Sequence, residues 1–312
     1  MKSALVFGHV NVGKSTLLGH LLYKLDYITE HEFKQLLTNA EACGKERSVF
    51  ARIMDCTVEE QESGNTYEYN MVKLKYSNQE YIFYDTPGHH IFLAQFIDAL
   101  TNAPATVILI VSAEVKELES SISSGFIREY TIICRCLGIT KLVVAINKMD
   151  KIKWGDYEII KNRVQQIVGK IGYNATYIVC NGFTGEGLTE RTSYYPEVPC
   201  LLETLIDEPY KETSDCIMSN KCLIHAIIFD KIPLSAGWSG VAHLGKQTEV
   251  CKIIKVFNSE KCSVPFVKNS NAYVLLEFAK PLNYHRNSRL ILRNGESTIA
   301  GGVVMTKDKS VS

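Results

Sequence analysis

A glycine-rich segment near the start of the chain has the residue types and the spacing needed to hold phosphate groups. Gly8 is separated by four residues from Gly13, which Lys14 and Ser15 follow directly, and this is the P-loop pattern. Glycines let backbone N–H groups turn toward a phosphate, the lysine can reach the β- and γ-phosphate oxygens, and the serine hydroxyl can bind Mg²⁺. We therefore expect a phosphate cradle made by Gly8, His9, Val10, Asn11, Val12, Gly13, Lys14, Ser15 and Thr16.

A second motif can recognise a particular base. Asn147, Lys148 and Asp150 follow the apolar run LVVAI in the tetrapeptide NKMD. The carboxylate of Asp150 can accept hydrogen bonds from N1 and the 2-amino group of guanine, and adenine has no such pair of donors. Asn147 can brace the loop, and the aliphatic stem of Lys148 can cover the base. After the later run TYIVC, backbone N–H groups can reach guanine O6 from Asn181, Gly182 and Phe183.

Two further segments can complete a magnesium and γ-phosphate site. Asp85 ends the apolar run YIFYD and can hold Mg²⁺ through water, and Gly88 can offer its N–H to the γ-phosphate. Thr66 lies just before the strand-like segment YEYNMVKLKY. It can complete the ligand shell of Mg²⁺ while GTP is bound and release the ion afterwards. The expected metal ligands are Ser15, Thr66 and Asp85.

The order of these motifs carries more weight than any one of them. Each alone is also typical of a glycine-rich or polar turn, and Thr66 alone is an ordinary exposed threonine. The phosphate, Asp85, guanine and Asn181 motifs each stand at the carboxyl end of an expected strand, which is the edge where open α/β sheets bind ligands. Together they predict a site for GTP or GDP with Mg²⁺.

Composition excludes several other classes. The chain has 312 residues, 46% of them hydrophobic and 22% charged, as is typical of a globular protein of about two domains. No apolar run approaches the roughly 18 residues of a membrane helix, and the apolar start is too short for a signal peptide. The ten cysteines are scattered without a CxxC pair, so we expect reduced thiols in the cytoplasm and no structural zinc.

The first two hundred residues alternate strand-like and helix-like segments, which predicts a mostly parallel sheet with helices on both faces. The expected helices include Lys14–Leu25, Ile122–Leu137 and Tyr157–Ile171. Two strands around the polar turn Ser77-Asn78-Gln79 predict an antiparallel hairpin. The expected strands are SALVFG, YEYNMVKLKY, EYIFYD, TVILIVSA, KLVVAINK and ATYIVCN.

The remainder reads as a linker and a second, all-β module. We expect a GTP-binding domain at 1–207, a polar linker at 208–220 and a small antiparallel barrel or sandwich at 221–308, built from six short strands. From Lys221 onward the chain has 13 Lys and Arg against 6 Asp and Glu, a net charge of +7. This basic module can face RNA or an acidic protein, or it can be a solvated lysine-rich surface.

With these residues in place, the chain resembles the translational GTPases, in the branch of elongation factor 1 alpha, release factor 3 and the Hbs-type ribosome-rescue factor. The segments that carry the resemblance are GHVNVGKSTLLGHLL, DTPGHHIFLAQFIDAL, REYTIICRCLGITKLVVAINKMD and CNGFTGEGL. Trp154 in NKMDKIKW, together with GFTGEGL and LRNGESTIAGGVV, resembles the Hbs type most. The resemblance implies that His89 orients the attacking water, and that Lys14 and Thr66 act with it in catalysis.

Four features depart from this family's pattern. Asn11 stands where the family has an aspartate, and Asn181 stands where it has a serine. The segment EEQESGNT before the hairpin lacks the family's arginines, which puts ribosome-triggered hydrolysis in question. The chain has room for one barrel rather than two, and its last strands resemble the final barrel, so the middle barrel is missing.

These features lead to three functional hypotheses. The first is a GTPase, monomeric by itself, that delivers a tRNA-mimicking Pelota-like protein to stalled ribosomes in mRNA surveillance, with no membrane or DNA contact. The second is a termination GTPase like release factor 3. The third is a binding module that is regulated by GTP or GDP and does not hydrolyse GTP.

Overall fold

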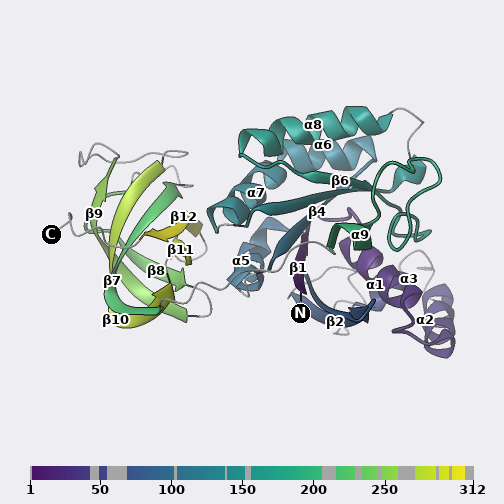
Figure 1. Cartoon of the computed structure of the whole chain (residues 1–312), viewed down its shortest axis with the longest axis horizontal. Helices are drawn as coiled ribbons and strands as arrows, with labels where there is room; N and C mark the ends of the chain where they lie inside the picture. The colour runs from purple at the N-terminus through teal and green to yellow at the C-terminus, as the bar shows by residue number, and fades with distance from the viewer. Residues whose placement is uncertain are drawn as a thin grey trace. The chain divides into compact units, whose positions relative to one another are not determined.

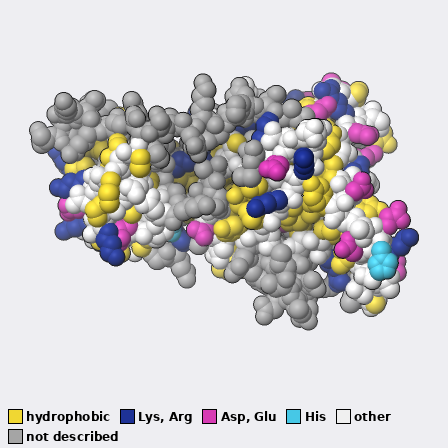
Figure 2. Space-filling view, turned by 60° about the horizontal axis from the view of Figure 1, so that its bottom comes forward, with side chains coloured by type: hydrophobic (Ala, Val, Ile, Leu, Met, Phe, Trp, Pro, Cys, Tyr) yellow, Lys and Arg dark blue, Asp and Glu magenta, His cyan; other side chains and the backbone are white. Residues whose placement is uncertain are grey.

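The computed structural model of the chain describes most of the sequence in two compact units, an α/β unit and an all-β unit (Figure 1). The described residues are 2–42, 49–54, 69–101, 104–137, 139–151, 156–205, 216–228, 234–244, 247–258, 271–285, 288–294 and 297–305. Within these ranges no helix is long and apolar enough to cross a membrane. On the face shown in Figure 2, charged side chains of both signs surround exposed apolar ones.

The α/β unit is built on a six-stranded sheet in the order β2-β3-β1-β4-β5-β6. Every pairing is parallel except that of β2 with β3. The six predicted strands are all present. Their bounds are β1 Lys2–Phe7, β2 Asn70–Tyr76, β3 Gln79–Asp85, β4 Thr106–Ser112, β5 Lys141–Asn147 and β6 Thr176–Val179.

Helices cover both faces of this sheet, as the alternation along β1 requires. Ala4 and Val6 belong to the buried cluster that includes α1 and α9, whereas Phe7 packs on the ring of Phe96 of α5 and on that of Tyr130 of α7. The helices are α1 Lys14–Lys24, α2 Glu30–Ala42, α3 Val49–Arg52, α5 Leu93–Thr101, α6 Val115–Ser123, α7 Phe126–Cys136, α8 Asp156–Lys170 and α9 Leu201–Leu205. Two short 3₁₀ turns, η2 His90–Phe92 and η3 Met149–Lys151, follow β3 and β5.

The hairpin of β2 and β3 has a tighter turn than the sequence suggested. Gln79 already pairs with Tyr76, so only Ser77 and Asn78 form the loop. Both have left-handed backbone, with φ of 47° and 62°, which is the conformation that two-residue hairpins favour because it matches the strand twist.

The expected single helix over Ile122–Leu137 is wrong. Helix α6 ends at Ser123 and α7 begins at Phe126, because Gly125 takes a left-handed φ of 78°. An α-helix cannot continue through a left-handed residue, so the apolar periodicity on the two sides belongs to two helices.

The second unit is a closed antiparallel barrel in the order β10-β7-β12-β11-β8-β9. The six expected strands are confirmed, and the closed ring decides between barrel and sandwich. Pro281, which lacks an N–H, falls inside β10 at the point where its register with β7 shifts between Glu277 and Leu282. The strands are β7 Cys216–Ile228, β8 Ser239–Leu244, β9 Gln247–Phe257, β10 Asn271–His285, β11 Arg289–Asn294 and β12 Ser297–Met305.

Strand β7 begins earlier than the sequence indicated. Cys216 and Ile217 pair with His285 and Tyr284 of β10, so the last residues of the segment 208–220 are strand rather than linker. The polar residues that precede Cys216 in that segment hid the strand, because the few strand residues after them are too short a run to show an alternation.

Candidate nucleotide-binding site

Four loops meet at one edge of the α/β sheet. They follow β1, β3, β5 and β6, which all run in the same direction in the sheet, through the parallel pairings of β1 with β3 and β4 and of β5 with β4 and β6. Parallel strands place their carboxyl ends at the same edge. The phosphate, Asp85, guanine and Asn181 motifs therefore lie together, although up to about 170 residues separate them along the chain.

The loop after β1 holds its lysine inside the fold. Lys14 is only 7% exposed, and its Nζ donates a hydrogen bond to the His9 carbonyl at 3.1 Å. Gly13 precedes the helix with a φ of 93°, and Asn11 is exposed with a φ of 66°. Asparagine and aspartate both tolerate this left-handed region, so the backbone at this position accommodates either residue.

The electrostatics of this loop favour an anion. Burial lowers the pKa of Lys14 to about 8, and the negative charge of Asp85 opposes only part of that shift. The pKa of His9 is also lowered, first by burial and then by the charges of His90 and Lys14. A phosphate beside these groups would return their pKa values upward and be stabilised in return.

Asp85 and Gly88 lie against the same lysine. Asp85 is fully buried at the end of β3. A methyl group at Gly88 would lie 2.5 Å from Lys14 Nζ and 2.9 Å from the Gly8 carbonyl oxygen. Only glycine fits there, so the backbone after β3 can approach the phosphate loop. Ser15 and Asp85 supply the oxygen ligands that Mg²⁺ prefers, whereas Thr66 lies outside the described residues.

The two histidines after Gly88 have different surroundings. His89 is exposed, and its Nδ1 accepts a hydrogen bond from the Ile91 N–H at 3.3 Å. His90 instead packs edge-on against the rings of Phe126 and Tyr130. The residues alone gave no reason to choose between them; in the structure His89 is exposed, whereas His90 is half-buried.

Asn147 joins the phosphate loop to the loop after β6. Its Nδ2 donates to the Val12 carbonyl at 2.8 Å, and its Oδ1 accepts from the Gly182 N–H at 2.8 Å. Asn147 is 2% exposed. The bracing role expected from the sequence therefore extends to both neighbouring loops.

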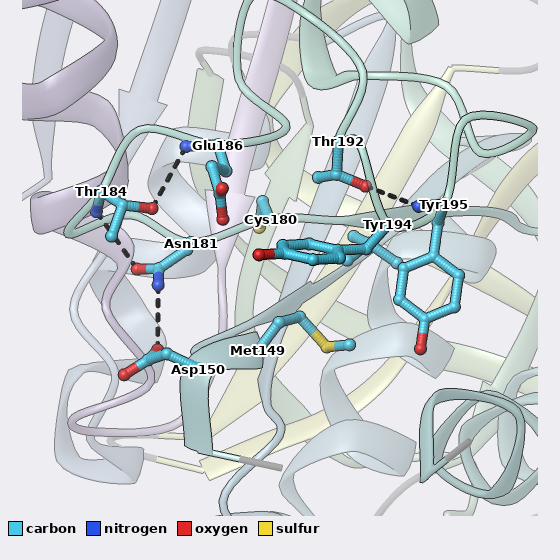
Figure 3. Close-up of a pocket in the computed structure, with 10 residues that line it drawn as sticks. Met149, Asp150, Cys180, Asn181, Thr184, Glu186, Thr192, Tyr194 and Tyr195 are labelled. Atoms are coloured by element: carbon cyan, nitrogen blue, oxygen red, sulfur yellow. Dashed lines mark hydrogen bonds between the residues drawn. The ribbon is translucent and has the colours of Figure 1, made fainter. Parts of the chain in front are cut away.

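Asn181 makes contacts with its side chain, beyond the backbone contact expected from the sequence. Its Nδ2 donates to Asp150 Oδ1 at 2.9 Å, and its Oδ1 accepts from the N–H groups of Phe183 at 2.9 Å and Thr184 at 3.3 Å (Figure 3). The amide thus fixes one carboxylate oxygen of Asp150, the residue expected to recognise the base, and the turn of its own loop. Phe183 is exposed.

Glu117 and His20 belong to the site although no motif contains them. Glu117 of α6 accepts two hydrogen bonds from Lys148 Nζ, at 2.7 and 2.8 Å. His20 of α1 bonds the Gly182 carbonyl through Nδ1 at 2.9 Å and stacks on Phe50. Glu117 is one of three acidic residues in six, and His20 lies on an ordinary buried helix face, so the sequence offered no signal for either.

This fold and this edge define a P-loop nucleotide-binding protein whose base-recognition loops are of the guanine type. The sequence comparison narrows the class. Residues 1–228 match the profile of the family described as "Elongation factor Tu GTP binding domain", and the chain belongs to this family.

Individual relatives of the chain support the same family. Elongation factor 1-alpha from Desulfurococcus mucosus is 37% identical over 210 residues, and that from Hyperthermus butylicus is 37% identical over 213 residues. Each alignment covers 64% of this chain and 48% of the relative. The chain therefore spans about half the length of the curated relatives it matches.

Solved structures share the fold over nearly the whole chain. The Ski7 GTPase-like domain of S. cerevisiae, bound to GDP and inorganic phosphate, superposes with a TM-score of 0.76 at 15% identity, covering 98% of this chain and 97% of that one. The bacterial selenocysteine-specific elongation factor EF-Sec gives a TM-score of 0.65 at 15% identity and covers 100% and 60%. The sequences are too different for these likenesses to show more than the fold.

Proposed function

We propose that this chain is a guanine-nucleotide switch that binds GTP or GDP with Mg²⁺ and hydrolyses GTP. The observation that carries the proposal is the linked pair of loops that Asn147 braces, with a buried Lys14 on the phosphate side and Asp150 on the base side. The Ski7 domain in this fold has been seen with GTP and with GDP and phosphate, which supports a nucleotide at the same edge.

Each group has a role in this proposal. Lys14 neutralises the β- and γ-phosphates, and backbone N–H groups of the loop and of the α1 N-terminus hold their oxygens. Ser15, Asp85 and, in the GTP state, Thr66 hold Mg²⁺, which would neutralise charge that develops on the phosphates. His89 orients the attacking water. Its Nδ1 accepts from the Ile91 N–H, so Nε2 is the ring nitrogen left to face that water.

We place this switch in ribosome rescue. The chain carries a single barrel, and a factor without a middle barrel lacks a surface that elongation factors use for aminoacyl-tRNA. In this proposal a tRNA-mimicking Pelota-like protein docks on the basic barrel and is released on the ribosome after hydrolysis. The missing middle barrel and the net charge of +7 from Lys221 onward both support this arrangement. A termination role like that of release factor 3 would use the same parts with a different partner.

Co-purification tests the partner. The chain is loaded with GDP or with a non-hydrolysable GTP analogue and offered a Pelota-like protein, release factor 1 and aminoacyl-tRNA. GTP-dependent capture of the Pelota-like protein alone supports rescue, and capture of release factor 1 alone supports termination. Tight, nucleotide-sensitive binding of aminoacyl-tRNA contradicts both.

A second candidate is a GTP- or GDP-regulated binding module that does not hydrolyse GTP. This candidate is favoured by Asn11, which stands beside the phosphates where the family has an aspartate. It is also favoured by the segment around Thr66, which lacks the family's arginines. Single-turnover hydrolysis with ribosomes present separates the candidates. A wild-type rate that exceeds that of His89→Ala supports the GTPase, whereas equal and negligible rates support the module.

A further inference from the structure

A cavity of about 280 Å³ lies in the α/β unit behind the base-recognition loops. Its walls come from η3, from the end of β6 and the loop that follows it, and from the segment around Tyr194 (Figure 3). None of the phosphate-side residues lines it. It is lined by Met149, Asp150, Val179, Cys180, Asn181, Thr184, Glu186, Thr192, Tyr194 and Tyr195.

The side chains that line the cavity carry negative charge and no positive charge. Asp150 and Glu186 are exposed carboxylates on one side of it. The Asn181 amide already donates to Asp150, and the backbone N–H groups of Glu186 and Tyr195 already donate to Thr184 and Thr192 inside the cavity. The hydroxyl groups of the lining can donate as well as accept, so the two carboxylates decide what fits: an occupant with a positive charge and N–H groups to donate to them.

One wall of the cavity is aromatic and apolar. In Figure 3 the Tyr194 ring lies across the cavity with its hydroxyl toward the side of Asn181, Glu186 lies above this ring in the view, and Met149 lies below it. Tyr194 is 53% exposed, so its ring is accessible to an occupant. A planar cation can lie on such a ring while its edge donates to a carboxylate, whereas a compact ammonium remains strongly hydrated.

We propose that this cavity binds the guanidinium group of an arginine side chain from a partner protein. The guanidinium supplies five donors in a plane, stacks on Tyr194 and donates to Glu186 and Asp150. A protein side chain fits better than free arginine, because the α-carboxylate of the free amino acid is repelled by the same two carboxylates.

The occupant also reaches the base-reading carboxylate. Asp150 Oδ1 is held by Asn181 at 2.9 Å, and Oδ2 lies 3.8 Å from Lys151 Nζ. A guanidinium that pulls on this carboxylate turns it away from N1 and the 2-amino group of guanine, so the arginine accelerates nucleotide release. This coupling rests on the proposed nucleotide site, whereas binding in the cavity does not.

Binding is tested first, by amide NMR on the full chain with and without GDP. The probe is Nα-acetyl-arginine methylamide, and the controls are the same derivatives of citrulline, which is planar but neutral, and of lysine, which is charged but not planar. We expect saturable shifts at Thr184, Thr192 and Tyr195 with the arginine probe, at least fivefold tighter than with either control. Equal shifts from all three probes, or none, overturn the proposal.

Variants and a source control complete the test. Glu186→Gln and Tyr194→Ala should each weaken the arginine probe at least fivefold, and Glu190→Gln, a nearby exposed acid outside the lining, should leave it unchanged. Tighter binding of free arginine than of the blocked probe overturns the assignment to a protein side chain. The release rate of fluorescent GDP then tests only the coupling between the cavity and the nucleotide site. A release rate that does not rise at saturating arginine probe overturns this coupling. A chain that binds no GDP contradicts the proposed function instead.

Discussion

Lys14 sits in surroundings that disfavour its own charge. It is 7% exposed, its Nζ has the His9 carbonyl as a partner at 3.1 Å, and Asp85 supplies only partial compensation. Burying this positive charge destabilises the folded chain until an anion binds. A site arranged in this way holds its cation ready for phosphate rather than for stability.

This burial makes stability depend on pH. The pKa of Lys14 is about 8 in the folded chain and 10.5 ordinarily, so between these values the unfolded chain binds more protons and stability rises with pH. From pH 7.5 to 9, nucleotide-free wild type should gain about 1 kcal/mol of unfolding free energy relative to Lys14→Met, measured by urea denaturation. An equal pH dependence in the two proteins would contradict the buried ammonium.

Glu117 offers a second test at this scale. Its carboxylate holds Lys148 Nζ twice, and both side chains are about one quarter exposed. Glu117→Gln should weaken GDP and IDP about fivefold and equally, because the lysine stem covers either base and the lost charge-assisted pair is partly screened. Asn181→Ala should instead reduce the preference for GDP over IDP, because Asp150 reads the 2-amino group that IDP lacks.

A matched control is available on the same helix. Glu119 pairs with Arg163 on the exposed side of α6, away from Lys148. Glu119→Gln should leave both nucleotide affinities unchanged, as equilibrium titration with a fluorescent nucleotide would show. If it weakens GDP as much as Glu117→Gln does, the effect belongs to α6 as a whole and the tether to Lys148 is not its cause.

At the scale of elements, one glycine separates two helices. Gly125 has a φ of 78° and open space around its Cβ position, whereas Gly169 lies within α8 with open space and no positive φ. Gly125→Ala should destabilise by about 1–2 kcal/mol, and Gly169→Ala should stabilise by about 0.5–1 kcal/mol. Chemical unfolding of the two variants measures both, and two shifts of the same sign would contradict the assignment.

The strands could be predicted because each is a run of apolar residues, or an alternation of apolar and polar ones as in β2, bounded by turn residues. β4 and β5 are buried almost throughout, and such runs leave little choice of structure. The break between helices at Gly125 could not be predicted, because the helical spacing of apolar residues continues on both sides of it. Only the backbone angle of Gly125 separates the two helices. The start of β7 was hidden for a different reason, since the polar residues that precede it made the whole segment 208–220 look like a linker.

The residues of the site also fall into those that the sequence could identify and those that only the fold brings together. Lys14, Asp85, Asn147 and Asp150 stand in motifs, and local spacing was enough to find them. Glu117, 31 residues from Lys148, and His20, 162 residues from Gly182, act through contacts that only the fold creates. The side-chain role of Asn181 was missed because a backbone contact had seemed sufficient there.

At the scale of the molecule, the two units have separate hydrophobic cores. The chain has two tryptophans, Trp154 and Trp238, and Trp238 packs against the barrel core. In a Trp154→Phe variant, tryptophan fluorescence therefore reports on the barrel, while far-ultraviolet circular dichroism reports mainly on the helical unit. The two signals allow each unit to be followed by itself.

We expect nucleotide to stabilise one unit alone. GDP and Mg²⁺ at 100 times the dissociation constant add about 2.7 kcal/mol to the state that binds them. Heating should show the dichroism transition raised by several degrees and the Trp238 transition unmoved. Equal shifts of both signals would mean that the barrel and the nucleotide site unfold cooperatively.

The closed order of the barrel has a consequence for the life of the protein in a crowded cell. Within the closed ring each of the six described strands has a hydrogen-bonded neighbour on both sides, whereas residues 216–222 of β7 extend beyond β12 and have β10 as their neighbour on one side only. In the α/β unit, by contrast, β2 ends the order of the described strands, and its outward lysines, Lys73 and Lys75, are the kind of charge that discourages such pairing. Another chain would therefore add a strand at one of these edges rather than within the closed ring, and the lysines make β2 a poor place for it.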